Sequence, residues 1–379
     1  MWIFIILAIL AILAIFICGV VRLFPLDLTD EGKKLKDKKV TIYLLCNLVL
    51  MANMFIVMMN FRKISNDTLA KVLLFFSSVY FIIIIYGSVV VLFRDIILFV
   101  IKRTRFKRAY KILKSKKFIR GLLVVLLVMA IGGYIAENFI VVKEYNVDIN
   151  KKAYKSEYTL VVLSDSHIGA GNTKEDFDEV VNMVNDINPD FIFLAGDMID
   201  ENTSDLNVEY FVNSIKKMKS NYGIFSVYGN HERHSQDKLF EMFKDTGVSI
   251  LQDDAVTIQG INIIGRKDAY SEGASITDII DKYNVDTSKP TIVLEHEPKQ
   301  YDILKKCNID LVLSGHTHGH QLPGAYPFLA LANDMVYGYD KFDNMNAIVS
   351  AGTGNWGIRF TTPGNNEVVK ITLNLEALW

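Results

Sequence analysis

Four long apolar stretches lie in the first 143 residues of this chain of 379 residues. They cover roughly residues 2–21, 40–59, 72–93 and 122–142, and each approaches or exceeds the ~20 residues that an α-helix needs to cross a bilayer. A soluble core helix of this length would carry a polar face, and these stretches carry none. The pattern therefore predicts an all-α transmembrane region of four helices over residues 1–143.

The first stretch could instead be a cleaved signal peptide. It lacks the basic segment before the apolar run and the A-x-A-like site after it that such peptides carry. Three further apolar stretches follow it along the chain. We therefore expect the first stretch to be a retained helix.

The charges of the intervening loops predict an orientation. Residues 22–39 contain six Lys or Arg, residues 60–71 contain three, and residues 102–120 contain ten. Cytoplasmic loops are the richer in these residues, so the first and third loops are expected in the cytoplasm, where the long basic loop would contact anionic headgroups. The prediction is a multi-pass protein of the cell membrane whose remaining residues lie outside the cytoplasm. If one of the four stretches does not span the membrane, the residues after the fourth stretch lie inside the cytoplasm.

The rest of the chain has the opposite charge. Residues 1–143 have 21 basic and 7 acidic side chains, whereas residues 144–379 have 20 basic and 35 acidic ones, a net charge of −15. Affinity for nucleic acid comes largely from Lys and Arg that neutralise phosphates. The charge of the second region therefore argues against a nucleic-acid partner.

Short apolar runs alternate with helical patterns from residue 158 onward. Strands are expected at residues 158–163, 191–195, 223–228, 291–294 and 310–313, with helices between several of them. This alternation is typical of an α/β domain. We predict a linker at residues 144–157 and a catalytic domain at residues 158–379.

Each of these five strands is followed at once by polar residues of the kinds that bind metals. In open α/β sheets, ligands bind beyond the carboxyl ends of the strands. All seven histidines of the chain lie in these loops, which is not how scattered structural histidines are distributed. The residues concerned are Asp165, His167, Asp197, Asn230, His231, His234, His296, His316, His318 and His320.

Imidazole and carboxylate groups together suit borderline divalent metals such as Mn, Fe, Zn, Co or Ni, of which we favour Mn. A carboxylate can also bridge two cations. Asp165 and His167, two residues apart in a turn after a strand, could both reach one metal. The residue types therefore predict a centre with two divalent metal ions.

Five motifs occur in a fixed order: D-x-H, G-D-x-x-D, G-N-H-E, a single His before Glu-Pro, and G-H-x-H. In this order they resemble the calcineurin-like metallophosphoesterase superfamily, from residue 158 to the end of the chain. The later G-T-G-N-W-G, residues 352–357, resembles the membrane-associated branch of that superfamily. The resemblance implies a four-layer α/β/β/α sandwich.

The resemblance also implies roles for individual residues. Asp165, His167, Asp197 and His318 would hold the first metal, and Asp197, Asn230, His296 and His316 the second, with Asp197 between them. His231 would be the general acid. Where this branch usually has Gly, the chain has His320. Candidate substrate-binding residues are His320, His234 and Arg266, each of which could equally be a loop or surface residue.

The leading functional prediction is a membrane-anchored phosphoesterase that uses two metals to hydrolyse a phosphomonoester, phosphodiester or pyrophosphate bond. A lipid-linked or cell-envelope substrate fits the expected membrane anchor, so the expected partners are the bilayer and a phosphorylated lipid or small molecule. The alternative is a non-catalytic membrane sensor that binds a phosphorylated ligand through the same site. Degenerate metal ligands would favour the sensor, and the five motifs show none. The sequence predicts no oligomeric state.

Overall fold

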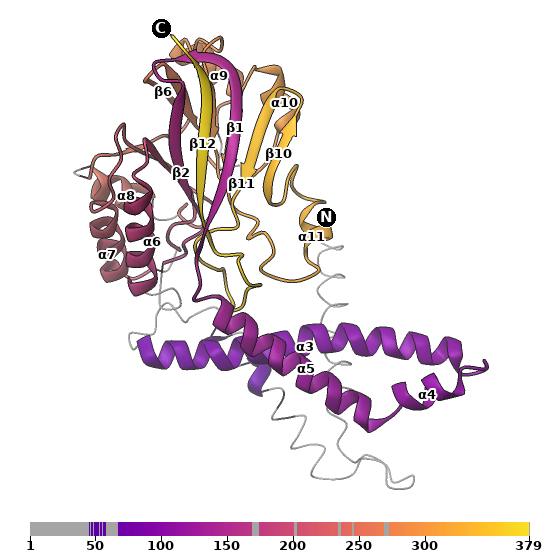
Figure 1. Cartoon of the computed structure of the whole chain (residues 1–379). Coiled ribbons are helices and arrows are strands. Elements are labelled where there is room, and N and C mark those ends of the chain that lie inside the picture. The colour runs from indigo at the N-terminus through magenta and orange to yellow at the C-terminus, as the bar shows by residue number, and fades with distance from the viewer. Residues whose placement is uncertain are drawn as a thin grey trace. The chain divides into compact units, whose positions relative to one another are not determined.

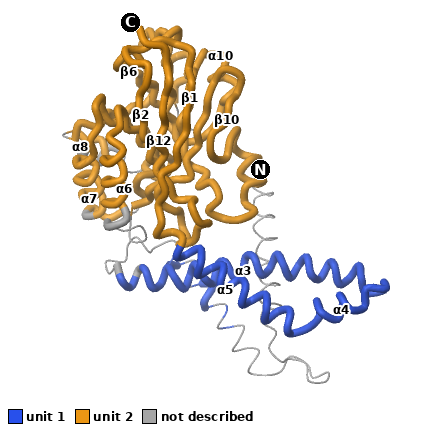
Figure 2. Tube along the Cα trace, in the orientation of Figure 1, with its two compact units in different colours: residues 1–61, 68–135 blue, residues 62–67, 136–379 orange. Residues whose placement is uncertain are grey.

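The computed structural model describes residues 67–168, 174–200, 203–233, 236–244, 246–268 and 273–378, together with isolated residues between 45 and 57 (Figure 1). The predicted helix at residues 2–21 lies outside the described residues. So does the predicted helix at residues 40–59, except for those isolated positions. The chain divides into two compact units (Figure 2). Unit 1 comprises residues 1–61 and 68–135, and unit 2 comprises residues 62–67 and 136–379.

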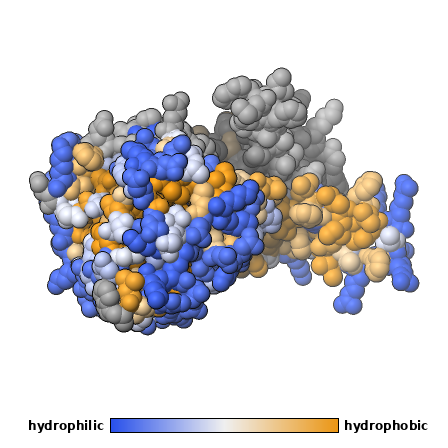
Figure 3. Space-filling model, turned by 90° about the horizontal axis from the view of Figure 1, so that it is seen from above, coloured by the Kyte–Doolittle hydropathy of each residue, from blue (hydrophilic) through white to orange (hydrophobic). Residues whose placement is uncertain are grey.

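The described part of unit 1 is helical, with α3 (Asp67–Ile101), α4 (Lys107–Leu113) and α5 (Lys116–Ala136). By length and composition, two helices in the described ranges could cross a membrane: Lys71–Ile101 and Lys116–Ala136. Large apolar side chains stay exposed on both, as for Phe99 on α3 at 83% and Val128 on α5 at 66%. Apolar side chains gather on the described part of this unit (orange in Figure 3).

The segment that follows α5 differs from the sequence-based prediction. The fourth apolar helix was expected to run to residue 142 and a linker to follow, but α5 ends at Ala136 and β1 occupies Val141–Ala153. Strand β1 pairs in parallel with β12 (Glu367–Ala377), and its residues Val147 and Ala153 are fully buried. The main segment of unit 2 therefore begins at Ala136 rather than at residue 158.

Unit 2 contains two six-stranded mixed sheets, ordered β1-β12-β2-β3-β4-β5 and β10-β11-β9-β8-β7-β6. In the first sheet, β2, β3, β4 and β5 are parallel; in the second, β7, β8, β9 and β11 are parallel. The remaining strands are β2 (Glu157–Leu163), β3 (Phe191–Ala195), β4 (Ile224–Val227), β5 (Val248–Ile250), β6 (Asp254–Ile258), β7 (Ile261–Gly265), β8 (Thr291–Leu294), β9 (Leu311–Ser314), β10 (Gly338–Phe342) and β11 (Met345–Val349).

Alternate side chains of the central strands enter different cores, as the two-residue period of a strand requires. Leu160 and Val162 of β2 join Ile292 of β8 in a cluster built from both sheets. Val161 of β2 instead joins helical side chains in a second cluster, and Val293 of β8 does so in a third. Both faces of each sheet are therefore buried.

Helices cover these outer faces. The second cluster takes residues from α6 (Lys174–Ile187), α7 (Asp205–Ile215) and α8 (Gln236–Phe243), which lie together beside the first sheet (Figure 1). The third takes residues from α9 (Ile276–Tyr283) and α10 (Tyr301–Lys306), and the short α11 spans Tyr326–Leu329. Because the central strands of each sheet are parallel, their carboxyl ends share one edge, where the loops carrying the predicted ligands begin.

Candidate metal centre

Asp165, His167 and His318 form the first ligand group. Their potential ligand atoms all lie within 4.8 Å of one another. The Nε2 atoms of His167 and His318 face each other at 3.2 Å, and they lie 3.9 Å and 3.6 Å from Asp165 Oδ1. The loop after β2 supplies two of these residues and the loop after β9 the third, so both sheets contribute.

Asp197, His296 and His316 form the second group, after β3, β8 and β9, with their ligand atoms equally close. His296 Nε2 lies 3.0 Å from Asp197 Oδ2. The other ring nitrogen of His296, Nδ1, lies 2.8 Å from the Ala195 carbonyl, to which it donates. This hydrogen bond sets the tautomer, so that Nε2 keeps the lone pair that a metal needs.

The backbone around these ligands is unusual. Five of the ligand residues have φ between +43° and +73°, which is rare outside glycine: Asp165, His167, Asp197, His316 and His318. Gly229 and Gly315 are required by space, because a Cβ at either position would collide with the carboxylate of Asp197 or Asp165. Strain of this kind concentrates at functional sites, where the surrounding fold maintains it.

The two groups have the donors that borderline divalent cations prefer. Asp165, Asp197 and His296 are almost completely buried, and buried charges require partners. The buried Oδ1 of Asn230 has no hydrogen-bond partner among the described residues, as expected of an oxygen reserved for a cation. These residues therefore fit two metal ions.

Carboxylates divide the histidines into two electrostatic classes. Burial would lower the pKa of His167 and of His296, but Asp200 raises that of His167, and Asp197 raises that of His296 well above its usual value. Burial lowers the pKa of His316 and of His318 to about 4. Each group thus combines one histidine whose pKa is raised with one whose pKa is lowered.

His231 lies beside the first group, with its ring centroid 5.0 Å from that of His167. Asp200 contacts both rings: its Oδ1 is 2.8 Å from His167 Nδ1 and 3.3 Å from His231 Nδ1. One carboxylate therefore hydrogen-bonds the ring of a predicted ligand and contacts the ring of the predicted general acid.

Glu232 accepts hydrogen bonds from backbone N–H groups rather than from a histidine ring, although carboxylates next to metal ligands more often orient the ligating histidines. Its carboxylate accepts hydrogen bonds from the backbone N–H groups of Gly229, Asp197 and Met198 at 2.7–3.0 Å, with a longer one from Ile199. Burial and the charge of Asp197 raise the pKa of Glu232 to about 7. The residue clamps the loops after β3 and β4 to each other.

The three predicted substrate-binding residues have different surroundings. The Arg266 guanidinium binds Glu295 at 2.6 Å and Gln300 at 2.8 Å. His320 is exposed, and its ring packs between the rings of Tyr326 and Tyr337. His234 lies outside the described residues.

Trp356 belongs to this site but has no role in the sequence-based prediction. Its ring centroid is 5.7 Å from that of His231, and 49% of its side chain is exposed. The sequence signal was the G-T-G-N-W-G motif, which lies just beyond a strand, as the ligand motifs do.

Comparison with known proteins identifies the same region of the chain. A family model described as "Calcineurin-like phosphoesterase" matches residues 158–320. An uncharacterized metallophosphoesterase of Helicobacter pylori is 35% identical over 233 residues, which are 59% of this chain and 61% of that protein. A Danio rerio protein named "Transmembrane protein with metallophosphoesterase domain" is 29% identical over 56% of this chain and 52% of its own.

The chain spans about three fifths of the length of the Helicobacter pylori relative. A solved structure of a dimetal phosphatase from Danio rerio matches with a TM-score of 0.39 and 10% identity over 57% of this chain and 92% of that one. The ordered motifs, the mixed sheets, the ligand groups and the family model agree. Residues 158–320 thus match the calcineurin-like phosphoesterase family model, and relatives of this part of the chain are named metallophosphoesterases.

Proposed function

We propose that this protein is a membrane-anchored phosphoesterase that requires two divalent metal ions. The observation that carries the proposal is the pair of ligand groups at one edge of unit 2, each built from both sheets. The proposed fold of the domain is the four-layer α/β/β/α sandwich, supported by apolar clusters on both faces of each sheet.

In this proposal Asp165, His167 and His318 hold the first ion, and Asn230, His296 and His316 hold the second. Asp197 lies between them as the shared ligand. When bound, two such ions activate water and neutralise charge on the phosphoryl group. Their identity is proposed from the donor set, with Mn favoured.

The chain's own residues orient the reaction. His231 would donate a proton to the departing oxygen, and the Asp200 carboxylate, 3.3 Å from its Nδ1, would stabilise its protonated form. Proton donation by a positioned side chain contributes about 10²–10⁴-fold to a rate. Glu232 keeps the backbone of Asp197 in place.

A lipid-linked or cell-envelope phosphoester is the proposed substrate, and the domain is proposed to work outside the cytoplasm. The exposed apolar surfaces of α3 and α5 support a membrane anchor. So do the loop charges and the name of the Danio rerio relative. The net charge of residues 144–379 disfavours nucleic acid.

The test uses the full chain in detergent, loaded in turn with Mn, Zn, Fe, Co and Ni. We expect hydrolysis of a chromogenic phosphomonoester or bis-ester with at least one of these metals. His231→Ala should lower kcat by about 10²–10⁴-fold and leave the metal content unchanged. Absence of turnover with every metal and both esters would refute the enzyme and favour the non-catalytic sensor. Loss of metal from His231→Ala would refute the role of His231.

The topology has its own test. A reporter fused to the carboxyl terminus, active only outside the cytoplasm, should be active in cells that express the full chain. A reporter of the opposite kind, active only in the cytoplasm, should be silent at the same position. The reverse pattern would overturn the topology of four spans with both termini outside the cytoplasm.

A further inference from the structure

Trp356 is presented at the same edge of unit 2 as the ligand groups. Strand β11 is parallel to β9, so the loop after β11 leaves the second sheet beside the loop that carries His316 and His318. Large aromatic side chains usually gain stability from burial, yet 49% of Trp356 is exposed. The exposed indole is tilted by 48° to the ring of His231.

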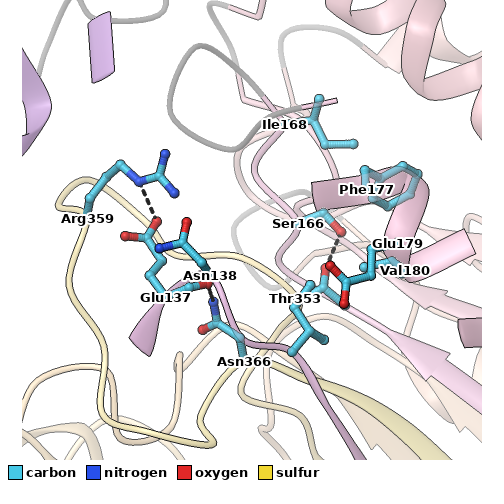
Figure 4. Close-up of a pocket in the computed structure, with 11 residues that line it drawn as sticks. Glu137, Asn138, Ser166, Ile168, Phe177, Glu179, Val180, Thr353, Arg359 and Asn366 are labelled. Carbon is cyan, nitrogen blue, oxygen red and sulfur yellow. Dashed lines mark hydrogen bonds and ion pairs between the residues drawn. The ribbon is translucent and has the colours of Figure 1, made fainter. Parts of the chain in front are cut away.

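Two contacts with the first metal-ligand loop hold the start of the Trp356 loop. The backbone N–H groups of Thr353 and Gly354 donate to the carbonyls of Ser164 and Asp165 at 2.9 and 3.1 Å. The hydroxyls of Thr353 and Ser166 lie 2.6 Å apart, beside the pocket in Figure 4. The loop is thus tied to the backbone of a metal ligand.

The far side of the loop is held as firmly. The side-chain amide of Gln321 donates to the carbonyls of Trp356 and Ile358 at 3.2 and 3.3 Å. Arg359 forms a 2.9 Å ion pair with Glu137, and 7% and 2% of the two side chains are exposed (Figure 4). With both flanks fixed, the position of the indole is set by the fold, and its exposed face is preorganised.

We propose that Trp356 is a specificity-determining residue whose exposed face receives a ring carried by the leaving group. This inference rests on the proposed function, in which His231 protonates the departing oxygen. A general acid must lie within hydrogen-bond reach of that oxygen, so the leaving group lies close to His231 and therefore to Trp356. Indole faces bind the faces of rings, so the leaving groups that fit are nucleosides, through the planar base, and sugars, through one face of the ring, rather than linear alcohols.

Three phosphomonoesters of primary alcohols test this: a nucleoside 5′-phosphate, a hexose 6-phosphate and glycerol phosphate, or their methyl diesters if the enzyme prefers diesters. Stacking of one base on an aromatic side chain is worth about 5- to 150-fold. Trp356→Ala should therefore lower kcat/KM for at least one ring-bearing ester by that factor and leave glycerol phosphate within about 2-fold. If kcat/KM falls only for the nucleotide, the group that stacks on Trp356 is a base. If it falls equally for the hexose phosphate, Trp356 accepts the face of any ring.

Matched variants separate stacking from damage to the fold. Trp356→Phe keeps a flat face and should retain most of the activity on ring-bearing esters. Tyr154 is 50% exposed and follows β1, whose carboxyl end lies at the opposite edge of the sheet, so Tyr154→Ala should change none of the three. An equal loss for all three esters in Trp356→Ala would overturn the proposal and make Trp356 a positioning residue for His231. No loss for any would also overturn it.

A binding measurement distinguishes failure of this inference from failure of the proposed function. A nucleoside or hexose phosphate should quench the tryptophan fluorescence of the full chain loaded with Zn²⁺, and Trp356→Phe should abolish the change; glycerol phosphate should not quench. Quenching without turnover would support the ring site and refute the enzyme. Turnover of ring-bearing esters without quenching and without dependence on Trp356 would refute the ring site alone.

Discussion

The two ligand groups consist of the same residue types but are held differently. In the first, the ring of His167 is oriented by the side chain of Asp200. In the second, the ring of His296 is oriented by the backbone carbonyl of Ala195. One substitution can therefore release the first ring, whereas no side-chain substitution removes the partner of the second. The first group is adjustable and shares its carboxylate with His231; the second is fixed by β3 itself.

Asp197→Asn should have the largest effect, because this carboxylate is the only one that the proposal shares between the groups. It lies 3.0 Å from His296 and accepts the backbone N–H of His231 at 2.8 Å. Metal-assisted charge neutralisation is worth several kcal/mol, so we expect kcat to fall about 10³-fold. Phosphoesterase assays and metal analysis of the purified protein measure this.

Asp302→Asn is the matched control, since its carboxylate is exposed on α10 and pairs only with Lys305 among the described residues. It should leave rate and metal content unchanged. If Asp197→Asn instead kept both metals and near-normal activity, the two groups would not share a ligand and would have to act separately.

Asp200→Asn should show the difference between the groups directly. Loss of a hydrogen bond that orients a ligating histidine typically costs about 10- to 100-fold in metal affinity. We expect that loss at the first site and less than about 2-fold at the second, whose His296 is held by backbone. Calorimetric titration with Zn²⁺ resolves the two sites. Equal weakening at both would mean that the rings are positioned by packing rather than by Asp200.

The ligand set could be predicted from the sequence because each ligand follows a strand within a few residues, and parallel strands bring their ends together. Residues 143–157 were expected to hold a linker and an entry strand, but the place of β1 in the sheet could not be predicted, because it pairs with β12, the last described strand. The charged pattern of this segment by itself suggests a linker, because its partner strand lies far away along the chain. Helix α9 was missed although its capping box, Ser275 with Asp278, is a readable signal.

Residue roles were harder to predict than residue positions. Asp200 and Glu232 both belong to the ordered motifs, and Asp200 orients a histidine ring. Glu232 binds backbone N–H groups instead, because the loops after β3 and β4 approach at Gly229, a closeness that depends on three-dimensional packing. The contact of Trp356 with His231 could not be predicted for the same reason, because their loops meet only in the folded chain.

Glu232→Gln should affect stability more than chemistry, and both groups about equally. An amide in place of the carboxylate sets N–H donors against backbone N–H donors in a buried site. Hydrogen bonds to a buried charge contribute about 1.5–3 kcal/mol each, so we expect the free energy of unfolding to fall by about 2–3 kcal/mol. Thermal unfolding of the detergent-solubilised protein should shift down by several degrees, whereas Glu179→Gln, on the exposed side of α6, should not shift it.

The smallest expected effect is the release of protons when metals bind. A metal takes only neutral imidazole, so a proton on His167 or His296, whose pKa values are raised, must leave when a metal binds, whereas His316 and His318, with pKa values of about 4, have none to lose at pH 7. Because raised pKa values favour the protonated, metal-free form, apparent metal affinity should fall as pH is lowered. Titrations in buffers of different ionisation enthalpy should therefore show that protons are released on metal binding. Asp200→Asn should remove the proton release that comes from His167, because Asp200 raises its pKa, and leave the release that comes from His296, which depends on Asp197.

A heat of binding that does not depend on the buffer in the wild-type protein would show that neither histidine is protonated before the metal binds. The electrostatic difference between the two groups would then be absent.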